Sequence, residues 1–321
     1  MGCGPGRYTG ATLSEELAVA LYEQMVLART LATAIETTRA DRSVGMRSSS
    51  FGEEATVIGA MAALNDDDWV FPGSRELLAL SWRGVSLAAQ ACRAFGTMYQ
   101  PPKGEGVRTT HLSAGVRVVA ASPLCGAQIP HAVGLAWAAR LRGADVAALV
   151  VFGEDAANRG DFHTGLNFAG VACAPVIAVR CVRETAAGGP PRGDVGFASL
   201  AYGIFGITVD GGDAVAVLQS VREARRRAAS GLGGTLVEAV LPRPGAADAS
   251  DPSGDPLVRM RQWLESRSIW SQEREDALRR DVDTDVTRAV AEAATGAPAP
   301  PSFFDHVYAE LPWHLQEQRR S

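Results

Sequence analysis

Two acidic side chains and one arginine follow apolar runs in the middle of the sequence. The run over residues 146–152 breaks at a glycine and is followed by Glu154 and Asp155, and a second run over 175–179 leads toward Arg183. In open parallel sheets, ligands bind just beyond the carboxyl ends of the strands. Carboxylates there can bind a divalent cation, and a guanidinium can bind phosphate. We therefore expect the chemistry of this chain at these two strand ends.

The elements that position these residues follow from the hydrophobic pattern. Between the two runs we expect a polar turn over 154–158 and a helix that begins near Gly160. Further helices are expected over 13–39, 53–63, 75–82, 87–95, 128–142 and 214–230, an inward apolar segment at 69–72, and strands at 206–209 and 235–240. Strands that alternate with helices predict an α/β fold, a parallel sheet with helices on both faces.

Two segments depart from this alternation. Residues 98–122 lack a periodic pattern and contain His111, so we expect a binding loop there. After a loop over 244–256, two amphipathic helices are expected over 257–266 and 271–296, followed by an aromatic tail. We therefore expect a flexible N-terminus (1–11), an α/β core (12–245) and a helical C-terminal extension of the same domain (246–321).

Composition limits the classes of partner and compartment. The 321 residues are 46% hydrophobic and 21% charged, with a formal net charge of −5, which is typical of a soluble globular protein. A negative net charge favours neither nucleic acid nor an anionic membrane. We find no apolar run of membrane-spanning length and no signal-peptide pattern at the N-terminus. The five cysteines lack CxxC spacing, so we expect reduced thiols and a cytoplasmic protein.

Short motifs in a shared order run through nearly the whole chain. They include Gly52-Glu53-Glu54-Ala55, Asp68-Trp69-Val70-Phe71-Pro72, Ser122-Pro123-Leu124, Gly160-Asp161-Phe162-His163 and Val307-Tyr308-Ala309-Glu310-Leu311-Pro312. With these motifs the chain resembles the alpha subunit of the decarboxylating component of 2-oxoacid dehydrogenase complexes, and most of all the branched-chain type.

This resemblance implies a thiamine diphosphate-binding fold and a set of site residues. An alpha subunit of this kind binds the diphosphate through Mg²⁺, pairs with a beta subunit as α2β2, and serves a lipoyl-bearing acyltransferase core. The resemblance implies that Glu154 binds the metal and that His111 lies near the reacting carbon. It also implies that the residues in contact with the cofactor are Arg75, Ser122, Leu124, Gly153, Glu154, Asp155, Ala156 and Arg183.

The cofactor positions also depart from the family pattern. Asp155 stands where a glycine is expected, which adds bulk and negative charge beside a phosphate. The paired asparagines of the family fall on Val182 and Arg183, and the preceding arginine falls on Cys181. We hypothesise that the Arg183 guanidinium takes the place of the metal by pairing with Glu154 and Asp155. Such a site would bind no metal and bind thiamine diphosphate weakly or not at all.

Two functions therefore stay open. The chain is either an active 2-oxoacid dehydrogenase subunit, which transfers the acyl group to lipoamide, or a non-catalytic, cofactor-less scaffold or regulator that pairs with a beta-type subunit. Simpler interpretations also stand for single residues: water-facing carboxylates at Glu154 and Asp155, a local ion pair for Arg75 and a surface position for His111. For Cys181 we prefer an inert buried thiol. We expect residues 225–227 to form a solvated helix face and residues 66–68 a solvated turn.

Overall fold

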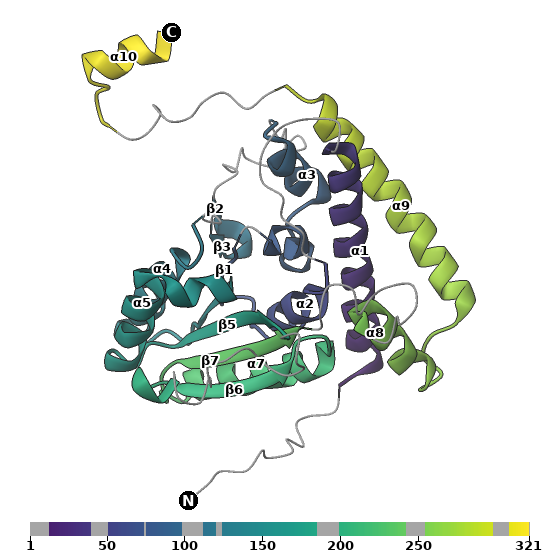
Figure 1. Cartoon of the computed structure of the whole chain (residues 1–321), viewed down its shortest axis with the longest axis horizontal. Coiled ribbons are helices and arrows are strands. Elements are labelled where there is room, and N and C mark those ends of the chain that lie inside the picture. The colour runs from purple at the N-terminus through teal and green to yellow at the C-terminus, as the bar shows by residue number, and fades with distance from the viewer. Residues whose placement is uncertain are drawn as a thin grey trace, which may run out of the picture.

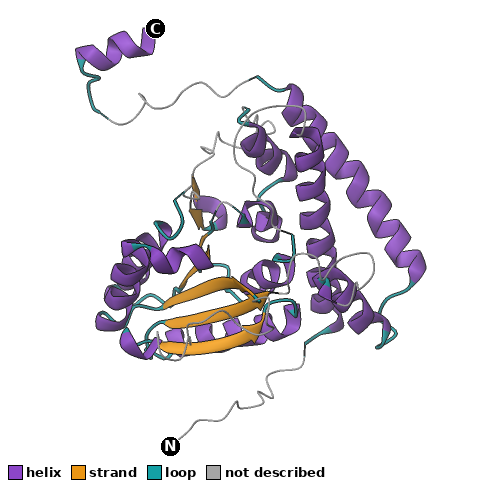
Figure 2. Ribbon diagram, viewed as in Figure 1, coloured by secondary structure: helices purple, strands orange, loops and turns teal. Residues whose placement is uncertain are grey.

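A seven-stranded sheet forms the centre of the molecule in the computed structural model, which describes residues 13–39, 51–73, 75–97, 112–119, 124–184, 199–241, 254–297 and 308–320. Its strands are β1 (Trp69–Phe71), β2 (Leu112–Ser113), β3 (Val118–Val119), β4 (Ala148–Gly153), β5 (Val176–Arg183), β6 (Phe205–Asp210) and β7 (Thr235–Leu241). They lie in the order β2-β3-β1-β4-β5-β7-β6 (Figure 2). Only the β2–β3 pair is antiparallel; the other five pairs are parallel. The predicted α/β fold is confirmed.

The central strand β4 shows why the sheet must be covered on both faces. All of its residues are buried, and its side chains alternate between two hydrophobic clusters. Leu149 and Val151 belong to one cluster, whereas Val150 and Phe152 belong to the other. Continuous apolar strands of this kind are typical of parallel sheets between helical layers.

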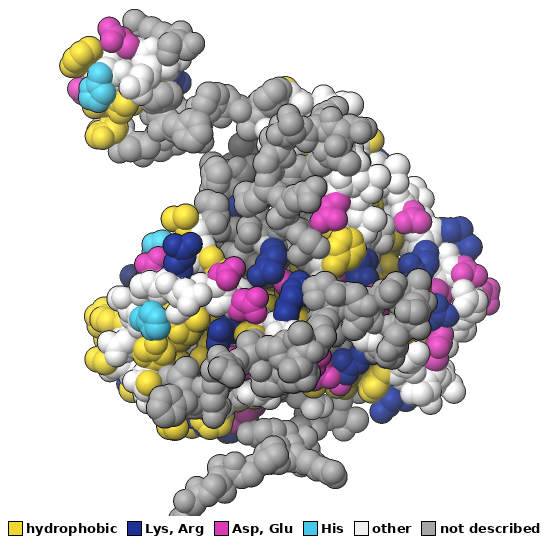
Figure 3. Space-filling view, in the orientation of Figure 1, with side chains coloured by type: hydrophobic (Ala, Val, Ile, Leu, Met, Phe, Trp, Pro, Cys, Tyr) yellow, Lys and Arg dark blue, Asp and Glu magenta, His cyan; other side chains and the backbone are white. Residues whose placement is uncertain are grey.

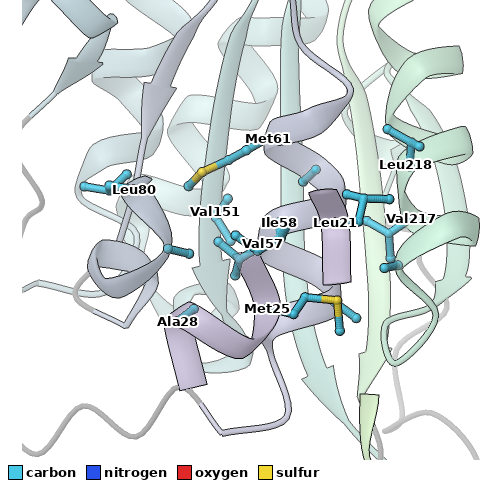
Figure 4. Close-up of a cluster of buried hydrophobic side chains, with 14 of the residues drawn as sticks. Leu21, Met25, Ala28, Val57, Ile58, Met61, Leu80, Val151, Val217 and Leu218 are labelled. Carbon is cyan, nitrogen blue, oxygen red and sulfur yellow. The ribbon is translucent and has the colours of Figure 1, made fainter. Parts of the chain in front are cut away.

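Helices form the two layers. Helices α4 (Gln128–Leu141) and α5 (Gly160–Val171) pack on one face, and α2 (Glu54–Ala62) and α7 (Ala214–Ala229) pack on the other. Outside α2 lie α1 (Glu15–Arg39), the 3-10 helix η1 (Glu76–Arg83) and α3 (Leu87–Phe95) (Figure 1). Side chains from α1, α2, α7 and β4 meet in the larger cluster; Figure 4 labels among them Leu21, Met25, Val57, Ile58, Met61, Val151, Val217 and Leu218.

The predicted C-terminal helices are present as α8 (Pro256–Glu265) and α9 (Gln272–Thr295). Helix α9 runs beside α1 (Figure 1), and Tyr22 on α1 donates a hydrogen bond to the buried carboxylate of Glu275 on α9. The extension therefore shares its core with the first helix. The predicted boundaries at residues 11–12 and 245–246 lie outside the described residues. Among the described helices, none has the length and apolarity needed to cross a membrane.

Two local predictions were wrong. The segment predicted to be an irregular loop contains β2, the 3-10 turn η2 (Ala114–Val116) and β3; its remaining parts, 98–111 and 120–122, lie outside the described residues. Strand β5 extends to Arg183 rather than ending near Val179. The C-terminal part of the chain, for which no element was predicted, contains α10 (Trp313–Arg320). Strands of two residues carry almost no periodic signal, which explains the first error.

Two charged segments predicted to be solvated also differ from the prediction. Asp68 is fully buried and Arg225 is 6% exposed. The Arg225 Nε lies 2.8 Å from Asp68 Oδ2 and its Nη1 lies 2.9 Å from Asp145 Oδ1. The pair joins α7 to the turn before β1, and a buried charge requires such a partner. In the sequence both residues lie in charged runs, and they are 157 residues apart, so their pairing leaves no local pattern.

Candidate functional site

The candidate site lies where three neighbouring parallel strands end. Arg75 follows β1, Glu154 follows β4, and Arg183 is the last residue of β5. The chain leaves β1 toward β3 and β2 on one side and leaves β4 toward β5 on the other. A reversal of this kind opens a crevice at the carboxyl ends of the strands, where α/β proteins bind ligands. Figure 3 shows basic and acidic side chains gathered in the middle of this face, over the region of β5 and α2.

Glu53 forms the centre of the site. This residue directly precedes α2, and its side chain is 1% exposed. Arg75 Nη1 lies 2.9 Å from Glu53 Oε1, and Arg183 Nη2 lies 3.3 Å from the same oxygen. Arg183 also donates a hydrogen bond of 3.4 Å to the carbonyl of Phe51. Glu53 Oε2 is buried and accepts no hydrogen bond from the described residues. One carboxylate oxygen is thus shared by two guanidinium groups.

The electrostatics of Glu53 reflect its burial. Burial raises the pKa of the Glu53 carboxyl above its ordinary value, and the positive charges of Arg75 and Arg183 only partly offset that effect. The negative charges of Glu54 and Glu154 raise the pKa further. The ionised form of Glu53 is therefore less favourable in the folded protein than in water, even with two arginines beside it.

Its neighbour Glu54 faces a separate ion-pair group. Glu54 pairs with Arg29 on α1, and Arg29 Nη1 lies 2.9 Å from Asp255 Oδ2. Asp255 caps α8 by accepting a hydrogen bond from the backbone N–H of Leu257. This group connects α1, α2 and α8 beside the site, and it holds the chain that carries Glu53 in place.

The Arg75 guanidinium lies directly against the backbone of Gly153 at the end of β4. A Cβ atom added at Gly153 would collide with Arg75 Nη2. Gly153 lies opposite Cys181 on β5, whose thiol is buried as we expected.

We expect Gly153→Ala to displace the Arg75 guanidinium from Glu53 and to lower the free energy of unfolding by about 1–3 kcal/mol, the usual cost of overpacking. Gly134→Ala is the control for an added methyl group that meets no atom within 4 Å; in the interior of α4 it should itself raise stability by about 1 kcal/mol, which the comparison takes into account. Urea unfolding of both variants measures the difference. Equal stability of the two variants would show that Arg75 does not depend on this glycine.

The predicted site residues are partly brought together. Gly153 and Glu154 lie with Arg75 and Arg183 at the adjoining strand ends. Asp155 is exposed in the 3-10 helix η3 (Glu154–Asn158).

The remaining predicted residues lie around this group or outside the described chain. Ala156 is buried on η3 and packs close to Gly126. A Cβ atom added at Gly126 would lie 3.2 Å from the Cβ of Ala156. Leu124 is 69% exposed. His111 and Ser122 lie outside the described residues.

The hypothesis that the Arg183 guanidinium pairs with Glu154 and Asp155 was wrong. The guanidinium pairs with Glu53 instead, and only the backbone N–H of Arg183 reaches Glu154, 3.4 Å from Oε2. Side chains along a strand alternate between faces. Cys181 faces the cluster that contains α2, so Arg183, two residues later, points toward α2 and Glu53.

The sequence analysis missed Glu53 as a site residue, although two signals were present. Glu53 begins a helix whose residues 54–61 are all buried, so its own side chain has little access to water. The period of two along β5 also assigns Arg183 to the α2 face. Neither signal identifies the pair from the sequence alone, because the second applies only once β5 is known to extend to Arg183.

The oxygen donors around Glu154 do not fit Mg²⁺. This ion requires octahedral coordination by oxygen, usually from carboxylates, amide or carbonyl oxygens and water. At the end of β5, Val182 is buried and apolar, and Arg183 presents an N–H group toward Glu154 rather than an oxygen. Among the described residues, no group of three or more His, Cys, Asp or Glu side chains could hold a metal ion.

Comparison with known proteins assigns the chain to a family. A model of the family "Dehydrogenase E1 component" matches residues 22–302. The chain is 33% identical to the mitochondrial 2-oxoisovalerate dehydrogenase subunit alpha of Bos taurus, over 96% of this chain and 72% of that protein. It is 32% identical to 2-oxoisovalerate dehydrogenase subunit alpha 2 of Arabidopsis thaliana, over 95% of this chain and 69% of that protein. It is also 31% identical to the pyruvate dehydrogenase E1 component subunit alpha of Staphylococcus aureus, over 95% of this chain and 86% of that protein. The chain therefore belongs to the dehydrogenase E1 component family.

Proposed function

We propose that this chain is the alpha subunit of the decarboxylating component of a 2-oxoacid dehydrogenase of the branched-chain kind. The proposed reaction is oxidative decarboxylation of a 2-oxoacid, with transfer of the acyl group to lipoamide. The observation that carries the proposal is the position of Arg75, Glu154 and Arg183 at the ends of three adjacent parallel strands, in a chain of this family. Two alpha subunits of 2-oxoisovalerate dehydrogenase are among the relatives that support the choice of substrate class.

The proposed cofactor is thiamine diphosphate, which supplies a stabilised carbanion for decarboxylation when it is bound. The chain's own part is to bind the diphosphate group. Arg75 lies against the backbone of Gly153 and presents a planar guanidinium there, which suits phosphate oxygens. Asp155, Ala156, Ser122 and Leu124 are proposed to line the same group, and His111 to lie near the reacting carbon.

The proposed partner is a beta subunit in an α2β2 assembly, with a lipoyl-bearing acyltransferase core beyond it. The outer side of α4 and α5 supports a protein partner. Trp137, Leu141, Phe168 and Val171 are 38–77% exposed there. Trp137 and Phe168 also pack edge to face with ring centroids 5.1 Å apart, and Figure 3 shows apolar side chains gathered over these helices. Exposed apolar patches of this kind are typical of subunit interfaces. A cytoplasmic location stays a prediction.

A second candidate function is a cofactor-less scaffold or regulator that pairs with a beta-type subunit. The observations that favour it are the replacement of the expected asparagines by Val182 and Arg183 and the exposed Asp155 beside Glu154. Loss of the cofactor would leave the fold and the subunit surfaces in place, since the cores on both faces of the sheet do not depend on the site.

Co-expression with the natural beta subunit separates the two functions. For the enzyme, we expect one thiamine diphosphate per alpha chain in the purified complex and dye reduction that depends on a branched-chain 2-oxoacid. Arg75→Ala should lose the cofactor, whereas Arg288→Ala, whose side chain is 67% exposed on α9, should retain it. A pure complex without cofactor and without dye reduction would establish the scaffold instead.

A further inference from the structure

Two guanidinium groups converge on one buried carboxylate at the carboxyl ends of β1 and β5. The Arg75 and Arg183 side chains are 33% and 24% exposed, so each guanidinium group is held by Glu53 while its side chain still reaches solvent. Glu53 is 1% exposed and directly precedes α2. The site therefore contains a fixed internal anion and two cations that remain accessible.

The positive charge of this site belongs to the protein. In a metal site of this kind, a divalent cation would bridge carboxylate oxygens and a phosphate. Here the nearest residue of β5 supplies a guanidinium on the α2 side and an N–H group toward Glu154. Both groups attract an anion directly, and neither can bind a cation.

We propose that the ends of β1, β4 and β5 form a metal-independent anion site, in which Arg75 and Arg183 bind a diphosphate group and Glu53 is the counter-ion that the ligand displaces. The choice of diphosphate deepens the proposed function and rests on it. Independence from metal rests on the contacts of Arg183 alone.

The geometry suits a ligand with more than one negative charge. A guanidinium binds phosphate through parallel N–H groups, and Arg75 and Arg183 can each present such a fork once they release Glu53 Oε1. A ligand with a single negative charge would only take the place of the Glu53 carboxylate at the two arginines, so its binding free energy would be small. A diphosphate carries enough charge to engage both arginines at once.

The second oxygen of Glu53, Oε2, bears on what happens when the ligand binds. This oxygen is buried without a hydrogen-bond donor among the described residues. A buried acceptor in this state is costly unless the group can take up a proton. When a ligand engages the two arginines, a proton on Glu53 would neutralise the buried carboxyl, so binding is expected to take up a proton.

Isothermal titration of the full chain with inorganic pyrophosphate tests the proposal. The chain is used in the assembly in which it purifies, and each titration is done with excess EDTA and again with Mg²⁺. We expect binding in EDTA at least as tight as in Mg²⁺. Arg183→Asn should weaken binding in EDTA by about tenfold or more, because it removes a charge-assisted contact. Arg288→Asn is the control for net charge and should bind as the native chain does.

Arg183→Lys guards against a variant that fails to fold. It keeps the charge but loses the planar fork, so its affinity in EDTA should lie between the native chain and Arg183→Asn. Binding only in Mg²⁺, no binding in either buffer, or binding in EDTA that survives Arg183→Asn would each overturn the proposal. Because this titration requires neither thiamine nor turnover, a chain that binds pyrophosphate in EDTA but purifies without cofactor would retain the anion site and refute only the proposed enzyme.

Discussion

Asp68→Ala should lower the free energy of unfolding by about 3–5 kcal/mol, the usual cost of breaking a buried ion pair from one side. Asp68 Oδ1 accepts a hydrogen bond of 2.8 Å from the backbone of Ala147. Its Oδ2 accepts from the backbone of Asn65 and from Arg225 Nε, each at 2.8 Å. Among the described residues, the substitution leaves the buried Arg225 with only the exposed Asp145 as a carboxylate partner. It also removes the acceptor that fixes the start of β4 to the turn before β1.

The neighbouring aspartate provides the matched control. Asp67 lies one residue earlier, its side chain is 74% exposed, and it pairs with the exposed Arg117 at 3.3 Å. Surface pairs of this kind contribute about 0–1 kcal/mol, so Asp67→Ala should change stability little. Urea unfolding, followed by far-ultraviolet circular dichroism, measures both variants. A loss for Asp68→Ala no larger than that for Asp67→Ala would refute the structural role of the buried pair.

Glu53→Gln should bind pyrophosphate about tenfold more tightly than the native chain near neutral pH. The amide keeps the shape of the side chain but removes the negative charge that competes for Arg75 and Arg183. Unit charges about 4 Å apart interact by about 4 kcal/mol at the effective dielectric of a protein surface, and partial exposure of both arginines reduces that value. About 1.4 kcal/mol corresponds to a factor of ten in affinity.

The same substitution should change how stability depends on pH. Burial raises the pKa of Glu53, Arg75 and Arg183 lower it, and Glu54 and Glu154 raise it again, with a net increase over the ordinary value of 4.5. A raised pKa means that the folded protein binds the proton more tightly than the unfolded chain does. The resulting stability is therefore fully present below the unfolded value and is lost as pH rises through the folded pKa.

Native and Glu53→Gln chains should accordingly have similar stability below the ordinary carboxyl pKa of 4.5, and the native chain should fall below the variant as pH rises above that value. Glu265→Gln is the control. It removes the same charge from a partly exposed pair with Arg261 on α8, outside the site. Urea unfolding at several pH values gives the comparison. A native chain that is the more stable of the two at the higher pH would show that the ionised carboxylate stabilises the fold.

Much of the fold could be predicted from the sequence because its pattern is strong and local. The helix over 13–39 and the strand that begins near residue 146 correspond to α1 and β4, since apolar residues recur there with one clear period. Strands β2 and β3 have two residues each and could not be distinguished from a loop. Pairings over long sequence distances, such as Asp68 with Arg225, leave no local signal at all.

The site could be located from the sequence but its contacts could not. The strand-end argument brought Glu154 and Arg183 to one edge of the sheet, and the family resemblance added Arg75, which follows β1 at the same edge. The partner of Arg183 depended on which face its side chain takes, and that in turn depended on β5 extending to its last residue. A strand that ends two residues earlier would have freed Arg183 to turn toward Glu154. The length of β5 thus decided whether the guanidinium meets Glu154 or Glu53.

The arrangement also bears on the asparagines that the family resemblance leads us to expect at Val182 and Arg183. A side-chain amide oxygen at Arg183 would serve a metal, but it would leave Glu53 with Arg75 alone. An arginine at that position supplies Glu53 with a second cation and leaves Glu154 without an oxygen partner from β5. The two solutions exclude each other at one residue. The double variant Asp155→Gly/Arg183→Asn replaces both residues that depart from the expected family pattern. We expect its diphosphate binding to depend on a metal ion.

A crystal structure of the full chain with pyrophosphate and Mn²⁺, with data collected at the manganese absorption edge, tests the metal-independent site most directly. We expect the diphosphate oxygens within hydrogen-bonding distance of the Arg75 and Arg183 guanidinium groups, and no anomalous peak beside Glu154. A manganese ion bridging Glu154 and the diphosphate, with Arg183 still paired to Glu53, would contradict it.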